Sequence, residues 1–253
     1  MIRNYIQNPP QFNLRGKEPM RLENLSDAVF AFSITLLVMT SEAPKNFEDL
    51  LTFSKSILSF AFSITIIMLI WHEHNTFFLR YGLRNNKIVF LNSILLLLIV
   101  FFIYPLKWLT AYIAGLITNG FLVSQNHEFI KSNQMPDLMI FYALGIISIY
   151  FTLYLMYKQA FSQKFKLKLN LFEIFETKAR MNSNLLMIGL PILSIFIVKI
   201  LENYSVGLAS ALSGMIYTFY FPMFWIFRKK YDKQLIKVLK NENILKEIEF
   251  TKV

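Results

Sequence analysis

The stretch from Arg21 to Met39, RLENLSDAVFAFSITLLVM, decides how the rest of this sequence is interpreted. It begins with charged and polar residues and then becomes apolar, apart from one serine and one threonine. At about 100° per residue on a helix, Phe32, Leu36 and Met39 fall within roughly 60° of one another. Asp27 lies on the far side of the same helical wheel. We therefore expect a helix with a narrow apolar stripe on one face and a buried carboxylate on another.

The composition is that of a membrane protein. Of the 253 residues, 55% are hydrophobic and 16% are aromatic, and the mean hydropathy is +0.45. Apolar runs long enough to cross about 30 Å of hydrocarbon as a helix recur along the chain. A helix satisfies its backbone hydrogen bonds within the segment, which a lipid environment requires. The sequence thus predicts an all-α polytopic membrane protein.

Charge and cysteine content narrow the possible functions. The formal net charge of +10 could indicate a nucleic-acid partner, but the basic residues lie in short connections between apolar spans, so we expect none. The absence of cysteine excludes disulfides and thiolate metal sites. Residues 1–19 are polar and lack the apolar core of a signal peptide, so we expect no cleavable signal.

Six apolar spans can be counted, and the second is short for a membrane helix. We expect this second span to extend from Ser54 to His74. The approximate limits of the six spans are Asn24–Thr40, Ile57–Trp71, Ile88–Tyr104, Leu138–Tyr157, Asn184–Ile200 and Val206–Phe227.

Lysine and arginine alternate strongly between the two sides of these spans. Of the 26 such residues, 21 lie before the first span, after the last, or in the second and fourth connections. By the positive-inside rule, both termini are cytoplasmic and the number of spans is even. We expect a cytoplasmic N-terminal segment (1–18), a six-helix transmembrane domain (19–228) and a basic cytoplasmic tail (229–253) of a multi-pass cell-membrane protein.

Several segments carry weaker local signals. Pro105 lies near the outer end of the third span, where a helix can break, and Pro191 is expected to kink the fifth span. The stretch 165–175 mixes lysines with large apolar residues. It predicts either an amphipathic helix at the membrane interface or an extension of the fifth span. The tail has helical spacing of its apolar residues and is expected to be a weakly ordered, solvated helix; the alternatives are packing on a partner subunit or on anionic lipid.

The motif Trp71-His72-Glu73-His74 suggests a metal site, but its spacing argues against one. Two histidines at i and i+2 point in nearly opposite directions, whereas the helical zinc pattern requires i and i+4. The third histidine, His127, lies in an outward connection. With no nucleotide-binding loop and no serine-nucleophile motif, we expect neither a metal site nor an enzyme.

Asp27 and Arg21 are the ionisable residues most closely associated with a membrane span, and such residues are functional candidates. One interpretation is that hydrogen bonds from neighbouring helices hold Asp27 and fix how the first span packs. The other is a proton relay through Asp27 in a coupled transporter. Trp71, His74 and Asn92 are expected at the same cytoplasmic depth and are plausible partners. The Asn92 amide also requires a partner, because its burial without one is costly.

The motif Arg21-x-x-x-Leu25-Ser26-Asp27, followed by an apolar run from Phe30 to Val38, resembles the signature of the transmembrane protein 175 family of potassium channels. Leu25 replaces the phenylalanine of the family motif, and Phe32 stands where the family usually has isoleucine or leucine. Four later positions also resemble family residues: Trp71, His74, Asn92 and Pro105.

The resemblance implies a homotetramer in which the first helices line a central pore that conducts potassium. Phe32, Leu36 and Met39 would form stacked apolar rings with Thr35 beside them, and the Phe32 ring would be the gate and take part in selection. No carbonyl filter loop of the usual potassium-channel kind is present, which agrees with the family. No cofactor is implied, and the expected partners are further copies of the chain and membrane lipid.

The resemblance also gives the polar residues a structural role. Arg21, Ser26 and Asp27 would bind Trp71, His74 and Asn92 and so hold the first helix in place. Two other functions remain open from the residues alone. One is a proton-coupled secondary transporter that uses Asp27, and the other is a scaffold or lipid-binding membrane protein.

Overall fold

The computed structural model describes residues 12–39, 44–118 and 132–250, and within these ranges every regular element is a helix. Predictions that involve His127 and Thr40 lie outside the described residues. The α-helices are α2 (Arg21–Met39), α3 (Phe47–Lys55), α4 (Ile57–Tyr81), α5 (Asn86–Ile117), α6 (Met135–Ser162), α7 (Leu171–Leu201), α8 (Val206–Met215) and α9 (Tyr220–Phe250), with 3-10 turns at Ser132–Gln134 and Ile216–Phe219.

Among the residues that the structure describes, six segments are long and apolar enough to cross a membrane, which confirms the predicted class and number of spans. Five are single helices, and the sixth combines α8, a 3-10 turn and the first part of α9. The second span is not short, but its expected limits were wrong: Ser54 belongs to α3, and α4 begins at Ile57 and continues past His74 to Tyr81. The hydropathy of the sequence did not include the last ten residues of this helix in the apolar span, because they contain charged and polar side chains.

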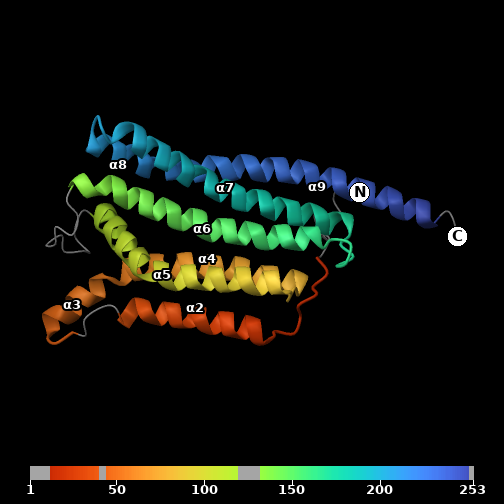
Figure 1. Ribbon diagram of the computed structural model, residues 1–253, viewed down its shortest axis with the longest axis horizontal. Helices are drawn as coiled ribbons and strands as arrows, with labels where there is room; N and C mark the ends of the chain where they lie inside the picture. The colour runs from red at the N-terminus through yellow and green to blue at the C-terminus, as the bar shows by residue number, and fades with distance from the viewer. Residues whose placement is uncertain (1–11, 40–43, 119–131, 251–253) are drawn as a thin grey trace.

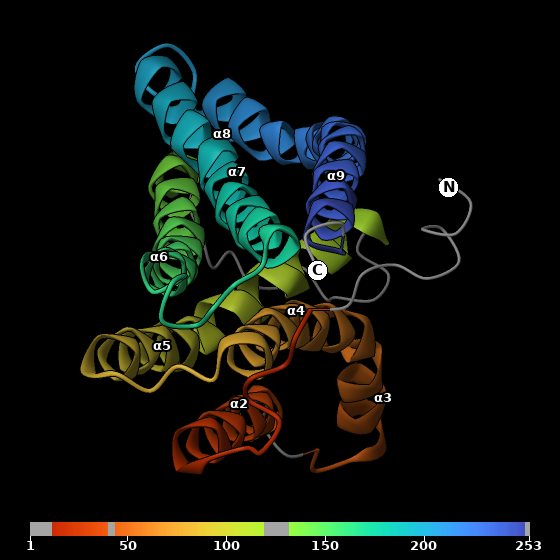
Figure 2. The same cartoon turned by 90° about the vertical axis from the view of Figure 1, so that its right-hand side faces the viewer.

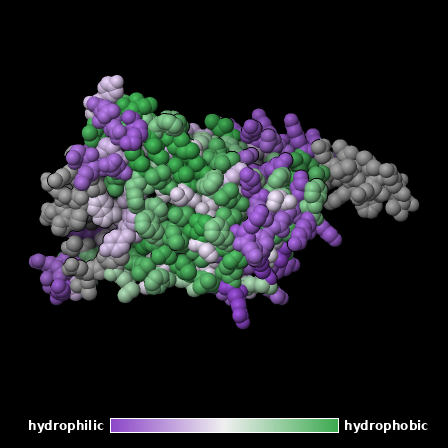
Figure 3. All heavy atoms as spheres, in the orientation of Figure 1, coloured by the Kyte–Doolittle hydropathy of each residue, from purple (hydrophilic) through white to green (hydrophobic). Residues whose placement is uncertain are grey.

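The helices form two groups that lie side by side (Figures 1 and 2). Helices α2 to α5 make one group and α6 to α9 the other, and α5 packs on α6 between them. Helix α2 lies at one edge of the bundle, where it packs only on α4 and α5 among the described elements. Figure 3 shows apolar side chains over the middle of the bundle and hydrophilic ones at both ends, as a membrane protein requires.

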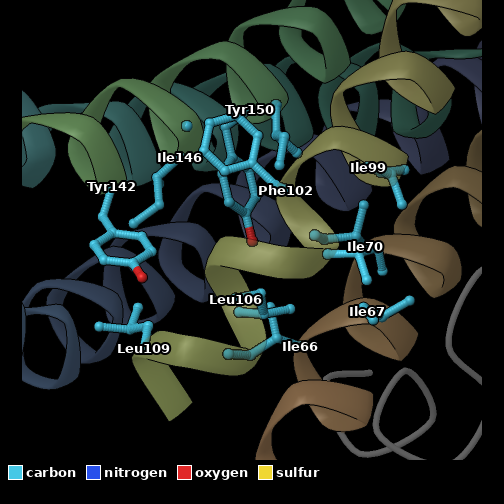
Figure 4. A pocket seen from close by; sticks show the side chains of 13 residues that line it. Ile66, Ile67, Ile70, Ile99, Phe102, Leu106, Leu109, Tyr142, Ile146 and Tyr150 are labelled. Carbon is cyan, nitrogen blue, oxygen red and sulfur yellow. The ribbon is translucent and has the colours of Figure 1, made fainter. Parts of the chain in front are cut away.

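Helix α5 does not end at Pro105, as the sequence suggested, but passes through it. Proline removes one helical hydrogen bond and commonly kinks a helix. Figure 1 shows α5 changing direction part-way along its length. The Tyr142 hydroxyl donates to the Pro105 carbonyl at 2.7 Å. Beside the bend, α4, α5 and α6 enclose an apolar cavity of about 140 Å³ (Figure 4).

The segment 165–175 is not one interfacial helix. Its first residues form turns, and Lys168 has a positive φ of 49°. Helix α7 then begins at Leu171 with a capping box, in which Asn170 and Glu173 satisfy each other's backbone N–H groups. From Leu171 onward the alternative interpretation, an extension of the fifth span, is therefore correct. Helix α3 was not predicted at all.

Candidate pore-lining helix and its polar contacts

The apolar stripe of α2 is only partly uncovered. Phe32 and Met39 are 55% and 73% exposed in the single chain. Leu36 is half-buried and packs against the core. Thr35 is exposed, and its hydroxyl donates to the Ala31 carbonyl of the same helix at 3.0 Å. The outward face of α2 is thus defined chiefly by Phe32 and Met39, with Thr35 between them in sequence and Leu36 at the edge.

The opposite face of α2 is attached to the bundle by a buried chain of hydrogen bonds. The Ser26 hydroxyl donates to the Leu22 carbonyl at 2.8 Å and accepts from Asn92 Nδ2 at 2.9 Å. Asn92 Oδ1 then lies 2.7 Å from His74 Nε2. Ser26, Asn92 and His74 are each at most 1% exposed. The chain therefore links α2 to α5 and α5 to α4.

This chain of bonds assigns the proton on the histidine ring. The Ser26 proton is used on Leu22, so Asn92 must present its NH₂ group to Ser26 and its oxygen to His74. An amide oxygen can only accept, so His74 Nε2 carries the proton. His74 Nδ1 is buried and has no hydrogen-bond partner among the described residues. A neutral ring protonated at Nε2 fits these contacts.

A second contact joins α2 to α4. Trp71 Nε1–H donates to Asp27 Oδ1 at 2.8 Å. Asp27 is exposed in the single chain, so the expectation of a buried carboxylate was wrong. The reason is the position of α2 at the edge of the bundle, where only the arc that contains Ser26, Phe30 and Leu37 is covered.

Arg21 lies apart from both groups of contacts. It is exposed at the start of α2, and the described residues provide it with no hydrogen bond or ion pair. Glu23, which was not singled out from the sequence, is instead buried on the covered face, and its Oε1 has no partner within the described ranges. Of the six predicted motif residues, the structure brings together Ser26, His74 and Asn92 in one chain of bonds and Asp27 with Trp71 in another.

Sequence reasoning missed three ion pairs that join α7 to α4 and to the segment before α2, which we call the ion-pair cluster. Its pairs are Arg15–Glu173 at 2.7 Å, Arg80–Glu176 at 3.0 Å and Arg180–Glu73 at 2.8 Å. The Glu173 and Glu176 side chains are only 0% and 9% exposed. Since a buried carboxylate without its partner is strongly destabilising, these pairs hold α7 to α4 and to the N-terminal segment.

Tyrosines complete the ion-pair cluster. The Tyr157 hydroxyl donates to Glu73 Oε1 at 2.8 Å, and the Tyr231 hydroxyl donates to Glu176. Tyr81 and Thr177 share a buried hydrogen bond of 2.7 Å. Helices α6 and α9 thus contribute to the same cluster.

The sequence signal for this cluster was the spacing of its charges. On α7, Glu173, Glu176 and Arg180 follow one another at i, i+3 and i+7, which places them on one face. Glu73 and Arg80 have the same i, i+7 relation on α4. Without their partners, the three arginines of the cluster indicated only which side of the membrane they occupy.

The fold and contacts define a class: a six-span α-helical membrane protein whose first span is bonded to the bundle on one face and uncovered on the other. Residues 21–102 match the family described as Endosomal/lysosomal potassium channel TMEM175. A Marivirga tractuosa protein named "Potassium channel" is 36% identical over 237 residues, or 92% of this chain and 95% of that protein. A potassium channel of Chamaesiphon minutus is 31% identical over 104 residues, 38% of this chain and 51% of its own.

A solved structure agrees with these relatives over most of the chain. It is the crystal structure of a variant of the potassium channel MtTMEM175 in complex with a Nanobody-MBP fusion protein. The TM-score is 0.80 at 36% identity, with 88% of this chain and 98% of that chain covered. The present chain belongs to the TMEM175 family.

Proposed function

We propose that this chain forms a potassium-selective channel: a homotetramer in which α2 of each subunit borders a central pore. The observation that carries the proposal is the division of α2 into two faces. Its inner face is fixed by buried hydrogen bonds, while Phe32 and Met39 are largely exposed at the edge of the bundle. The relatives named as potassium channels support potassium as the permeant ion. No cofactor is part of the proposal.

In this arrangement four copies of Phe32 form the narrowest apolar ring, with Met39 two turns further along. A hydrophobic constriction gates because water leaves it readily and a dehydrated ion crosses it at high cost. Potassium loses its water more easily than sodium, which favours it at such a ring. The Thr35 hydroxyl donates to the Ala31 carbonyl, so its oxygen keeps an acceptor position for a passing cation. Leu36 contributes from the edge of the ring.

The polar residues are proposed to brace the pore wall rather than to carry protons. Asp27 is bonded to an indole N–H, which can donate but cannot accept a proton at that atom. Ser26, His74 and Asn92 lie on the side of α2 away from Phe32 and link it to α4 and α5. Arg21 is exposed and is available to a neighbouring subunit.

We further propose that both termini are cytoplasmic, on the basis of the uneven distribution of lysine and arginine. Residues 1–18 and 229–253 would then be cytoplasmic segments on either side of the 19–228 channel domain. The limit at residue 228 marks a change in composition within α9, because the helix continues across it.

The proposal is tested with purified protein reconstituted in a planar bilayer. In a potassium/sodium gradient, the reversal potential should lie near the potassium equilibrium potential. Phe32→Ala is expected to increase single-channel conductance severalfold and to weaken selectivity, because it widens the ring. The matched control is Phe196→Ala on α7, which is 60% exposed and should leave current unchanged. A current that Phe32→Ala does not alter would remove Phe32 from the constriction, and particles without four-fold symmetry would contradict the tetramer.

A further inference from the structure

A groove lies between the first turns of α5 and the last turns of α6, away from α2. It has a volume of about 340 Å³. Phe90 and Leu91 of α5 and Leu155 of α6 form its apolar part, and Lys87 and Lys158 stand on its two sides. The start of α5 and the end of α6 lie at the same end of the bundle in Figure 1. The same groove thus combines an apolar surface with two positively charged lysine side chains.

Both lysines are available to an anion. Each is exposed, and neither forms an ion pair with any residue in the described ranges. Lys158 Nζ lies 5.9 Å from the centre of the Tyr154 ring. The ring carries no net charge, so this contact does not neutralise the lysine. Lys87 is in the first turn of α5, where the helix dipole also attracts negative charge, and the Ile88 N–H of this turn is already capped by Asn85 Oδ1.

The apolar part of the groove distinguishes a lipid from a soluble anion. Phe90 is 66% exposed beside Leu91 and Leu155. A hydrated phosphate would leave these three apolar side chains exposed to solvent. An acyl chain would cover these side chains. The groove lies at the end of the bundle where basic connections gather, the proposed cytoplasmic side, and anionic lipids are attracted to basic pockets there.

We propose that this groove binds an anionic phospholipid of the inner leaflet, with the phosphate between Lys87 and Lys158 and an acyl chain along Phe90, Leu91 and Leu155. Bound lipid would hold α5 against α6. Asn92, which follows Leu91, donates a hydrogen bond to Ser26 of α2, so the lipid would also support the attachment of that helix. The lipid site does not depend on ion conduction.

Native mass spectrometry of delipidated protein with phosphatidylglycerol tests the proposal. The double variant Lys87→Ala with Lys158→Ala should bind this lipid roughly 30-fold more weakly, because each lysine near an anionic surface contributes about fivefold. The matched control is Lys166→Ala with Lys237→Ala, two exposed lysines outside the groove at the same end of the bundle, which should lose less than about threefold. Phosphatidylcholine should bind weakly to every variant.

Three results would overturn the proposal. Equal lipid binding by the groove variant and the control variant would place the lipid elsewhere. Binding of glycerophosphoglycerol, the same headgroup without acyl chains, as tightly as the lipid would show that the groove takes a soluble phosphate. A change of subunit number in the groove variant, without loss of lipid, would mean that a second copy of the chain covers this surface.

Discussion

The hydrogen bonds of Asn92 give the most direct test of how α2 is held. Asn92 is fully buried, accepts from His74 and donates to Ser26, and so joins three helices. Asn92→Leu replaces the amide with an apolar side chain of similar size. The substitution therefore removes both bonds without leaving a large cavity, and it strands the His74 Nε2–H in a buried site where Nδ1 already lacks a partner.

The cost can be worked out from these contacts. Hydrogen bonds between membrane helices are worth about 0.6 to 1.7 kcal/mol each, because the unfolded chain in the membrane also finds partners. Two lost bonds therefore cost about 1–3 kcal/mol. A buried donor without an acceptor adds a further penalty, which moves the expected value to the upper part of this range, about 2–3 kcal/mol.

The free energy of unfolding is measured by detergent-dependent denaturation in mixed micelles. The matched control is Ser93→Ala, the next residue, whose exposed hydroxyl bonds only to Val89 of its own helix. Its cost should stay below about 0.5 kcal/mol. A double-mutant cycle with Ser26→Ala should give a coupling energy of about 0.6–1.7 kcal/mol. If Asn92→Leu were as stable as the unchanged protein and the coupling were zero, the buried chain of bonds would not hold α2.

Two further substitutions test other parts of the bundle. Arg180→Ala leaves the mostly buried Glu73 carboxylate without its cation and should cost about 2 kcal/mol, between the values for exposed and buried pairs, while Lys233→Ala should cost almost nothing. Gly82→Ala should cost at least ~1–2 kcal/mol, since φ is 56° and the new Cβ would lie 2.8 Å from a carbonyl oxygen. The new Cβ of Gly189→Ala would meet no atom within 4 Å beyond the neighbouring backbone of its own helix, so this substitution should be neutral or stabilising. Thermal unfolding in detergent measures all four, and equal losses within either pair would refute the corresponding contact.

Segment length and hydropathy were sufficient to predict the six spans, because each span must carry enough apolar residues to cross the bilayer. The polar contacts of α2 were partly accessible for a related reason. A buried amide needs a partner, and the alternating direction of the spans places Asn92 and His74 at the same depth as Ser26. Depth and polarity together therefore indicate which polar side chains of different spans can meet.

The remaining features depend on neighbours that a helical wheel does not contain. The wheel placed Leu36 within the stripe of Phe32, yet the packing of α4 and α5 on α2 half-covers it. Asp27 was expected to be buried because it lies on the face of α2 opposite the apolar stripe, but α2 lies at an edge of the bundle. Helix α3 is only nine residues long and carries no membrane-length apolar run to reveal it.

Helix α4 is the element on which the two sets of polar contacts meet. Trp71 and His74 face α2 and its partners, whereas Glu73 and Arg80 reach the ion-pair cluster. At about 100° per residue, Glu73 and Arg80 lie roughly 160–180° from Trp71 and roughly 100–120° from His74, so α4 is bonded on two different faces. Each set of contacts contains a buried polar or charged group that would be left without a partner if the contacts broke. Because this is costly, both sets resist a displacement of α4. The position of the exposed face of α2 is therefore set through α4 by the second helix group, although α2 touches only the first.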